Sequence, residues 1–202
     1  MIELETRPEG GLATDFPLMR RRRMMGLAGG TTVAALAAGG GSAIARSGIV
    51  RGDIRRGFGT AHGVARGVPL DIRLRLTSAN SGRPLTGHAV YLWHADRDGN
   101  YSLVTPELAG ENYLRGIQLA DSAGWVRFTS VFPGSHDGRW PHLHVEAYAG
   151  LHDLDRPLHT AAITLPADVY EKAHVHPGAR LEMACMTGDV RRGLVATRTI
   201  AI

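Results

Sequence analysis

Residues 70–77 alternate strictly between apolar and polar side chains, and this pattern limits the fold more than any other feature of the chain. Leu70, Ile72, Leu74 and Leu76 are separated by Asp, Arg and Arg, and Thr77 follows. A period of two is typical of a β-strand with one face buried and the other in solvent. Further strands are predicted at Ala89–Ala95, Gly124–Val131, His142–Tyr148, His159–Leu165 and Leu194–Ile202.

Turn-forming residues separate these segments, as in Asn80-Ser81-Gly82 and Thr187-Gly188-Asp189. Only one short helix, Pro166–Lys172, is expected beside them. Short strands with frequent turns and no helical periodicity between them are typical of two packed antiparallel sheets. We therefore predict the all-β class, with an antiparallel β-sandwich and long loops over its surface.

The first 47 residues predict an export signal followed by a linker. Arg20–Arg23 precedes an uncharged run from Met24 to Ala45, and Ala43-Ile44-Ala45 has the small-x-small pattern of a signal-peptidase site. The run is rich in Gly, Ala and Thr, which favours a signal over a membrane anchor. Arg21 and Arg22 favour the twin-arginine export machinery as a partner, and an ordinary secretory signal is the alternative.

The expected location is therefore extracytoplasmic or secreted, and residues 48–202 are expected to form one domain. After residue 48 the chain has 17 Lys and Arg residues against 15 Asp and Glu, without a basic cluster. This balance does not favour nucleic acid as a partner. Cys185 is the single cysteine, so no internal disulfide forms. We expect Cys185 to be a small buried apolar residue.

Two histidines in the predicted strand His142–Tyr148 have the spacing of metal ligands. His142 and His144 project to one face of a strand, so both imidazoles can reach one ion. Leu143, Val145 and Ala147 take the opposite face, which would pack into the core. The histidines would then need shelter from the loops Tyr101–Tyr113 and Pro133–Pro141.

Several ordered motifs resemble the intradiol ring-cleavage dioxygenases, the family of catechol 1,2-dioxygenase and protocatechuate 3,4-dioxygenase. The resemblance covers most of residues 49–202. Its motifs are Val50–Arg55, Gly67–Leu70, Pro84–Asp96, Gly99–Ser102, Leu114–Gln118 and Pro133–His144.

The resemblance implies one ferric ion per chain, held by two tyrosinates and two histidines in a mononuclear site. By motif position the first tyrosine is Tyr101, and the histidines are His142 and His144. Arg139 matches the family arginine that stabilises charge developing on the bound catecholate. The second tyrosine is replaced by His136, two residues after Pro133-Gly134.

Replacement of a tyrosinate by His136 removes a negative charge from the expected site. Three imidazoles and one phenolate favour Fe(III) less, and they also suit Fe(II), Zn(II) or Cu(II). Imidazole can still bind a metal, leave it and accept a proton, so His136 is expected as the labile ligand; a solvent-facing turn histidine is the alternative. The family commonly has a glutamine after the threonine of the strand that follows the histidines. Here Ala161 follows Thr160, so the resemblance implies that a hydrogen bond supporting the ligands is lost, which counts against catalysis.

Two functions follow from these motifs. The first is an exported Fe(III)-dependent dioxygenase that cleaves a catechol-type ring with O2 to a muconate-type diacid. The second is a catalytically silent β-sandwich that keeps the fold and a metal and acts as a binding or structural module. A homo-oligomer is left open. His174-Val175-His176 repeats the ligand spacing, but Pro177-Gly178 follows at once, which indicates a surface loop.

Overall fold

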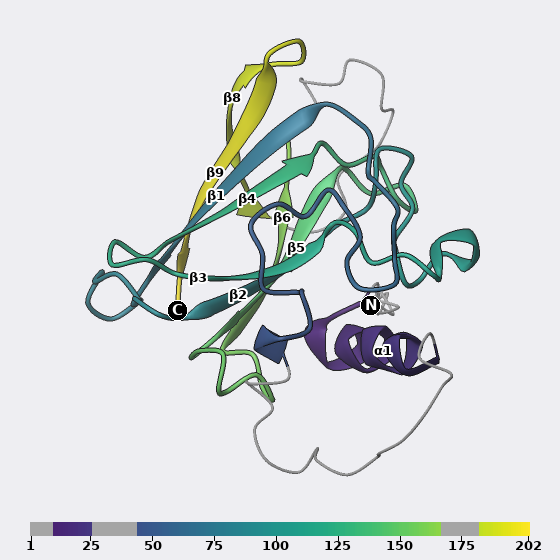
Figure 1. The fold of residues 1–202 in the computed structure, drawn as a ribbon. Helices are drawn as coiled ribbons and strands as arrows, with labels where there is room; N and C mark the ends of the chain where they lie inside the picture. Colours follow the sequence, from purple (N-terminus) through teal and green to yellow (C-terminus); the bar gives the residue numbers. More distant parts are fainter. Residues whose placement is uncertain (1–9, 26–43, 167–181) are drawn as a thin grey trace, which may run out of the picture.

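The structure is a computed structural model of the 202-residue chain, and it describes residues 10–25, 44–166 and 182–202. Two sheets face each other, as Figure 1 shows, which confirms the predicted all-β sandwich. The four-stranded sheet has the order β4-β1-β9-β8, and the five-stranded sheet has the order β3-β2-β5-β6-β7. Residues 167–172 of the predicted helix Pro166–Lys172, and the loop around His174 and His176, lie outside the described residues.

The strands of the four-stranded sheet are β1 (Pro69–Thr77), β4 (Trp125–Val131), β8 (Cys185–Asp189) and β9 (Gly193–Ala201). Those of the five-stranded sheet are β2 (Ala89–Trp93), β3 (Arg115–Leu119), β5 (His142–Tyr148), β6 (His159–Thr164) and β7 (Glu182–Met183). Most neighbours are antiparallel, but β1 pairs with β9 in parallel, and so does β6 with β7. The first of these pairs joins segments that are far apart in the sequence, such as Leu70 and Leu194, and local sequence patterns do not report such a pairing.

The main core lies between the sheets and consists of the alternating residues that the sequence predicts. Leu70, Ile72, Leu74 and Leu76 of β1 are at most 1% exposed. Leu143, Val145 and Ala147 of β5 face them from the other sheet and are fully buried. Burial of such aliphatic side chains is the main source of stability in a sandwich. The predicted parity of β5 is therefore confirmed.

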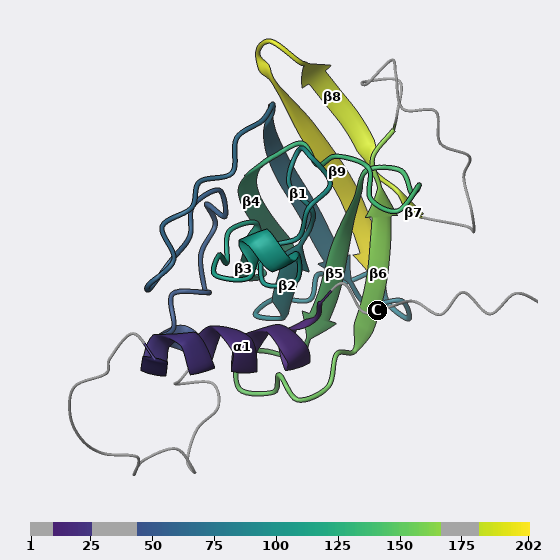
Figure 2. The same ribbon diagram turned by 90° about the vertical axis from the view of Figure 1, so that its right-hand side faces the viewer.

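A second apolar cluster covers the outer face of the five-stranded sheet. Tyr91 and Trp93 of β2 pack there with residues 101–103 and with the helix α1 (Leu12–Met25). Figure 2 shows α1 lying alongside the sheet formed by β2, β5 and β6. In the part of the chain that the structure describes, no helix is long and apolar enough to cross a bilayer.

The structure also adds elements that sequence patterns did not predict. Strand β3 contains Gly116 and is only five residues long, so it lacks a clear alternation. A short 3₁₀ helix, η1 (Pro106–Leu108), lies in the loop after Tyr101.

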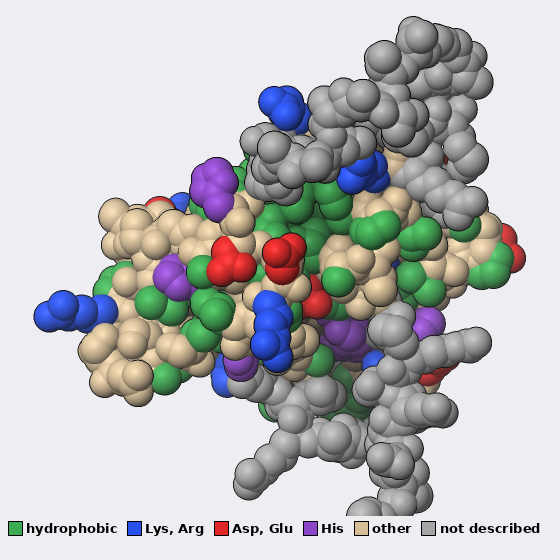
Figure 3. Space-filling view, turned by 90° about the horizontal axis from the view of Figure 1, so that it is seen from below, with side chains coloured by type: hydrophobic (Ala, Val, Ile, Leu, Met, Phe, Trp, Pro, Cys, Tyr) green, Lys and Arg blue, Asp and Glu red, His purple; other side chains and the backbone are tan. Residues whose placement is uncertain are grey.

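Cys185 is exposed on β8, so the expectation that it is buried is wrong. Figure 3 shows the molecule from below relative to the view of Figure 1, and the described Lys and Arg side chains are scattered over this face.

Candidate metal centre

Three polar side chains meet at one end of the outer face of the five-stranded sheet. The Tyr101 hydroxyl lies 3.3 Å from Nε2 of His142 and 3.2 Å from Nε2 of His144. The two imidazole Nε2 atoms are 3.0 Å apart. Tyr101 is 1% exposed and His142 is 4% exposed, so this cluster is shielded from bulk water.

The spacing of these three atoms fits a single metal ion. Bonds of about 2.0–2.1 Å in a tetrahedral site place neighbouring donor atoms about 3.3–3.4 Å apart, and right-angled neighbours about 2.9 Å apart. Phenolate oxygen and imidazole nitrogen are ligands for iron, copper and zinc. Within the described ranges, no group of three or more His, Cys, Asp or Glu side chains is arranged to hold a metal. The centre therefore depends on the phenol of Tyr101.

Both histidine rings are oriented by their neighbours. Nδ1 of His142 lies 2.7 Å from the Trp140 carbonyl, which requires the proton on Nδ1 and leaves the lone pair on Nε2. The His144 ring stacks on Trp93, with 4.9 Å between ring centroids and 11° between planes. Trp93 thus supports a candidate ligand from the neighbouring strand β2. Its stacking on His144 depends on the β2–β5 register, which pairs the two residues directly.

The electrostatic environment keeps the histidines neutral. Burial, with smaller contributions from the charges of His142 and Arg139, lowers the pKa of His144 to about 3. Burial also lowers the pKa of His142, although the Trp140 carbonyl opposes the change. Burial raises the pKa of Tyr101 well above its usual value. Without a metal, Tyr101 is therefore a neutral phenol, and its proton must leave when it binds an ion.

His136 lies beside this cluster on a tight turn. Asp137 and Gly138 have φ of 47° and 71°, and His136 pairs with Arg139 across them, which is the geometry of a two-residue hairpin turn. The His136 ring meets the Tyr101 ring edge-on, with 4.9 Å between centroids. Its Nδ1 lies 2.7 Å from the Gly99 carbonyl, and its Nε2 lies 3.5 Å from Oδ2 of Asp137.

Two glycines allow the His136 loop to approach the Tyr101 loop. A Cβ atom on Gly99 would lie 2.2 Å from the Ser135 carbonyl oxygen, and one on Gly134 would lie 2.4 Å from the Arg97 carbonyl oxygen. Gly99 also has φ of 84°, which glycine adopts without strain. The Gly134 amide donates a 2.7 Å hydrogen bond to the Asp96 carbonyl. These contacts hold His136 next to Tyr101.

Arg139 is close enough to the histidines to act on their charge. Its positive charge lowers the pKa of both His142 and His144, and partial burial lowers its own pKa. The turn through Asp137 and Gly138 aligns Arg139 with His136. The structure thus brings a cation to the edge of the candidate metal centre.

The strand register changes the interpretation of Ala161. His144 pairs with Ala162, whereas Ala161 pairs with Val145 and shares the face of the core. The expectation that the residue at 161 supports the histidines is therefore wrong, because parity points it to the other side of the sheet. Ala162 is the cross-strand neighbour of His144, and a methyl group cannot donate or accept a hydrogen bond there.

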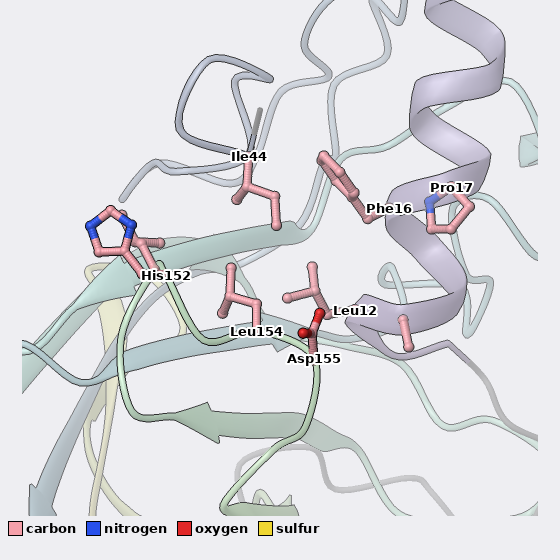
Figure 4. Close-up of a pocket in the computed structure, with 9 residues that line it drawn as sticks. Leu12, Phe16, Pro17, Ile44, His152, Leu154 and Asp155 are labelled. Atoms are coloured by element: carbon pink, nitrogen blue, oxygen red, sulfur yellow. The ribbon is translucent and has the colours of Figure 1, made fainter. Parts of the chain in front are cut away.

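A separate pocket of about 400 Å³ lies between α1 and the loop after β5. It is lined by Leu12, Ala13, Phe16, Pro17, Ile44, Leu151, His152, Leu154 and Asp155. In the close-up, Leu12, Phe16, Ile44 and Leu154 point toward one another (Figure 4). None of the candidate ligands lines this pocket. We therefore base the functional argument on the cluster of Tyr101, His142 and His144.

Comparisons with known proteins point to one family. Residues 53–172 match a protein family described as Dioxygenase. A 110-residue stretch is 32% identical to chlorocatechol 1,2-dioxygenase from Rhodococcus opacus, and it covers 44% of this chain and 42% of that protein. This chain therefore matches less than half of the length of that relative.

Solved structures show the same fold. An intradiol ring-cleavage dioxygenase from Tetranychus urticae superposes with a TM-score of 0.58 at 23% identity, over 76% of this chain and 86% of that one. The dioxygenase domain of a carbohydrate-binding fusion protein from Streptomyces sp. SirexAA-E has a TM-score of 0.54 at 22% identity, over 76% and 87% of the two chains.

Proposed function

Because this chain belongs to the intradiol ring-cleavage dioxygenase family, we propose that it cleaves a catechol-type ring with O2 in an iron-dependent reaction. The bond between the two hydroxyl-bearing carbons breaks, and both atoms of O2 enter a muconate-type diacid. The observation that carries this proposal is the meeting of Tyr101, His142 and His144, whose donor atoms lie 3.0–3.3 Å from one another.

We infer that Tyr101, His142 and His144 would hold one Fe(III) per chain. When bound, this ion would supply Lewis-acid chemistry and a template for the substrate. The neutral imidazoles offer their Nε2 lone pairs without losing a proton, since the pKa values of both histidines are lowered. The phenol of Tyr101 must lose its proton, and the fixed ring positions reduce the cost of assembling the site.

His136 and Arg139 are proposed to act on the substrate side of the centre. With its Nδ1 proton donated to the Gly99 carbonyl, His136 keeps a basic Nε2 that can bind the metal or take a proton from a catechol hydroxyl. For this role, the exposed Asp137 side chain has to move away from Nε2, because the hydrogen bond of Nδ1 to Gly99 fixes the ring. Arg139 offsets negative charge on the ring as the hydroxyl protons leave.

We also propose that residues 1–47 direct export by the twin-arginine route. Arg21 and Arg22 precede the uncharged run from Met24 to Ala45. This route exports folded proteins, which suits a site that assembles before export. Replacement of Arg21 and Arg22 by lysine is expected to stop export, and unchanged secretion of that variant would favour the general secretory route.

One observation favours the second candidate function, a catalytically silent metal-binding module. Ala162 stands opposite His144 and supplies no polar group to it. Loss of polar support around a ligand weakens metal affinity in other sites. Catalysis therefore has to be measured separately from metal binding.

The experiment is to purify the full chain from iron-replete cells and follow O2 uptake and diacid formation with catechol. Ring cleavage with one O2 consumed per catechol supports the proposal. An iron-loaded protein that leaves catechol and O2 unchanged would establish the silent module instead. His142→Ala is expected to abolish cleavage, whereas His62→Ala, at an exposed loop position, is a matched control that should keep it.

A further inference from the structure

A buried carboxylate of the N-terminal helix binds the outer face of the five-stranded sheet. Asp15 on α1 is 1% exposed and forms an ion pair with Arg115 on β3, which is also 1% exposed. The Tyr91 hydroxyl on β2 donates a 2.6 Å hydrogen bond to the same carboxylate. Figure 2 shows how closely α1 follows this sheet.

Additional contacts fix the start of α1 in this place. The Leu12 amide donates a 2.9 Å hydrogen bond to Glu146 on β5, and the Tyr148 hydroxyl donates to the same carboxylate oxygen. Gly11, whose φ is 145°, passes so close to Glu146 that an added Cβ would lie 3.0 Å from its carboxylate. The helix therefore meets the sheet through directed polar contacts as well as through apolar burial.

One line of contacts runs from Asp15 to Tyr101. Nε of Arg115 donates a 3.1 Å hydrogen bond to the Ser102 hydroxyl, and its NH2 group donates a 2.6 Å bond to the Ser102 carbonyl. The Ser102 hydroxyl in turn donates to the Tyr113 carbonyl at 2.7 Å. Since Ser102 directly follows Tyr101, the guanidinium fixes the backbone that carries this phenol.

The backbone at both ends of this link is strained. Leu103 has φ of 69° and Leu114 has φ of 56°, which leucine rarely adopts. Leu103 follows Ser102, and Leu114 precedes Arg115. Such conformations persist where surrounding contacts over-determine them.

A second line of contacts runs from Asp15 to His144. The ring of Tyr91, held by Asp15 through its hydroxyl, stacks on Trp93 with centroids 5.2 Å apart and an interplanar angle of 22°. The Trp93 ring in turn stacks on the ring of His144. The three rings form a continuous stack from α1 to a candidate ligand.

From these two lines we propose that Asp15 is a positioning residue for the metal centre. It holds Arg115 and Tyr91, which orient Tyr101 and His144 respectively, and α1 is consequently part of the metal-holding protein. The proposal rests on the proposed function for its metal, but the docking of α1 does not.

The buried charge explains why Asp15 is needed. A fully buried guanidinium without its carboxylate is strongly unfavourable, so Arg115 would turn toward water. Its two hydrogen bonds to Ser102 would then be lost. Removal of residues 1–45 at the predicted peptidase site would remove Asp15, so we expect the iron-loaded protein to retain α1. Ile44, within that site, is 6% exposed and packs in the same outer cluster.

The test uses the full chain and the variants Asp15→Asn and Ser102→Ala. Asp71→Asn, at an exposed position of β1, is the matched carboxylate control. Trypsin cleavage within Arg20–Arg23 of the metal-free protein reports docking of α1. The wavelength of the tyrosinate-to-iron charge-transfer band, per bound iron, reports ligand geometry. Asp15→Asn is expected to speed trypsin cleavage by roughly tenfold or more and to shift the charge-transfer band. Ser102→Ala is expected to shift the band without faster cleavage, because its α1 contacts are intact.

Each arm has a result that overturns the proposal. If trypsin cleaves Asp15→Asn at the same rate as the parent protein, the ion pair does not hold α1. Faster cleavage with an unchanged band and unchanged iron content would show that Asp15 only stabilises the fold. Recovery of iron-loaded protein that lacks residues 10–25 would also contradict it. If the parent binds no iron, the proposed function fails, and the cleavage arm still decides whether Asp15 docks the helix.

Discussion

The two faces of strand β5 are built on different principles. Its inner face carries Leu143, Val145 and Ala147, which pack into the core between the sheets. Its outer face carries His142, His144 and Glu146, which contact residues from distant segments: Tyr101 and α1. The inner face needs only apolar side chains of suitable size, whereas the outer face needs particular atoms at particular positions. Stability and chemistry are therefore separated by strand parity.

The largest expected effect is on the inner face. Leu143→Ala removes a fully buried side chain and should lower the free energy of unfolding by about 2–5 kcal/mol. Urea denaturation of the metal-free protein measures this loss. A change below that range would show that the strand packs more loosely than the structure indicates.

Next in size is an effect of His94, which directly follows β2 and is buried against Ser130 of β4. His94 lies between the Ala95 carbonyl and the Ser130 hydroxyl, at 2.7 and 2.6 Å, and burial lowers its pKa from 6.5 to about 4. Between pH 6.5 and 4, His94 binds a proton in the unfolded chain but stays neutral in the folded protein. The contribution of His94 to stability is thus complete above pH 6.5 and falls by roughly 3 kcal/mol as the pH drops to 4.

The His94 effect is measured as the pH dependence of unfolding of the metal-free protein. His94→Gln should make the curve less steep over this range, with the remaining slope coming from His142 and His144, whose pKa values are also lowered. The exposed His62→Ala should leave the curve unchanged. An equally steep curve in His94→Gln would assign the acid sensitivity to other groups.

On the outer face, His144→Ala should separate metal binding from folding. We expect iron affinity to fall by roughly 100-fold or more, a loss of about 2.7 kcal/mol in binding, with unfolding of the metal-free protein changed by less than about 1 kcal/mol. Equilibrium dialysis measures the iron affinity, and urea denaturation measures the free energy of unfolding. Stoichiometric iron retained at parental affinity would mean that His144 is not a ligand.

The smallest effect is expected from His136→Tyr, which restores the family residue beside Tyr101. A second phenolate should deepen the charge-transfer colour and raise the rate of catechol cleavage by roughly tenfold, a factor typical of a ligand-tuning change. A variant with the spectrum and turnover of the parent would show that the side chain at 136 does not reach the metal.

The two faces also differ in how far sequence predicts them. Alternation predicts β1 and gives the bounds of β5 as the structure has them, because burial of one face imposes a local period. The same parity pairs His142 with His144. Residue Ala161 was placed wrongly because the strand register, not the motif order, determines which side chain lies opposite His144.

The contacts of the outer face lie too far apart in sequence for a local pattern to report them. Asp15 and Arg115 are 100 positions apart, and Leu12 and Glu146 are 134 apart. Leu12–Met25 lies within the region predicted to be an export signal, and its docking on the sheet had no signature in the sequence. The exposure of Cys185 also depends on tertiary structure. Cysteine is a residue type that favours burial, but the short strand β8 lies at the edge of its sheet and leaves Cys185 exposed.

The central claim is that Tyr101, with His142 and His144, holds the iron, and Tyr101→Phe tests it most directly. The parent, purified from iron-replete cells, should contain one iron per chain and show a visible tyrosinate-to-iron band. Tyr101→Phe removes one oxygen atom and should abolish that band while the histidines still bind some iron. A band of the same position and intensity per iron in Tyr101→Phe, or a parent that is colourless and free of metal, would contradict the account.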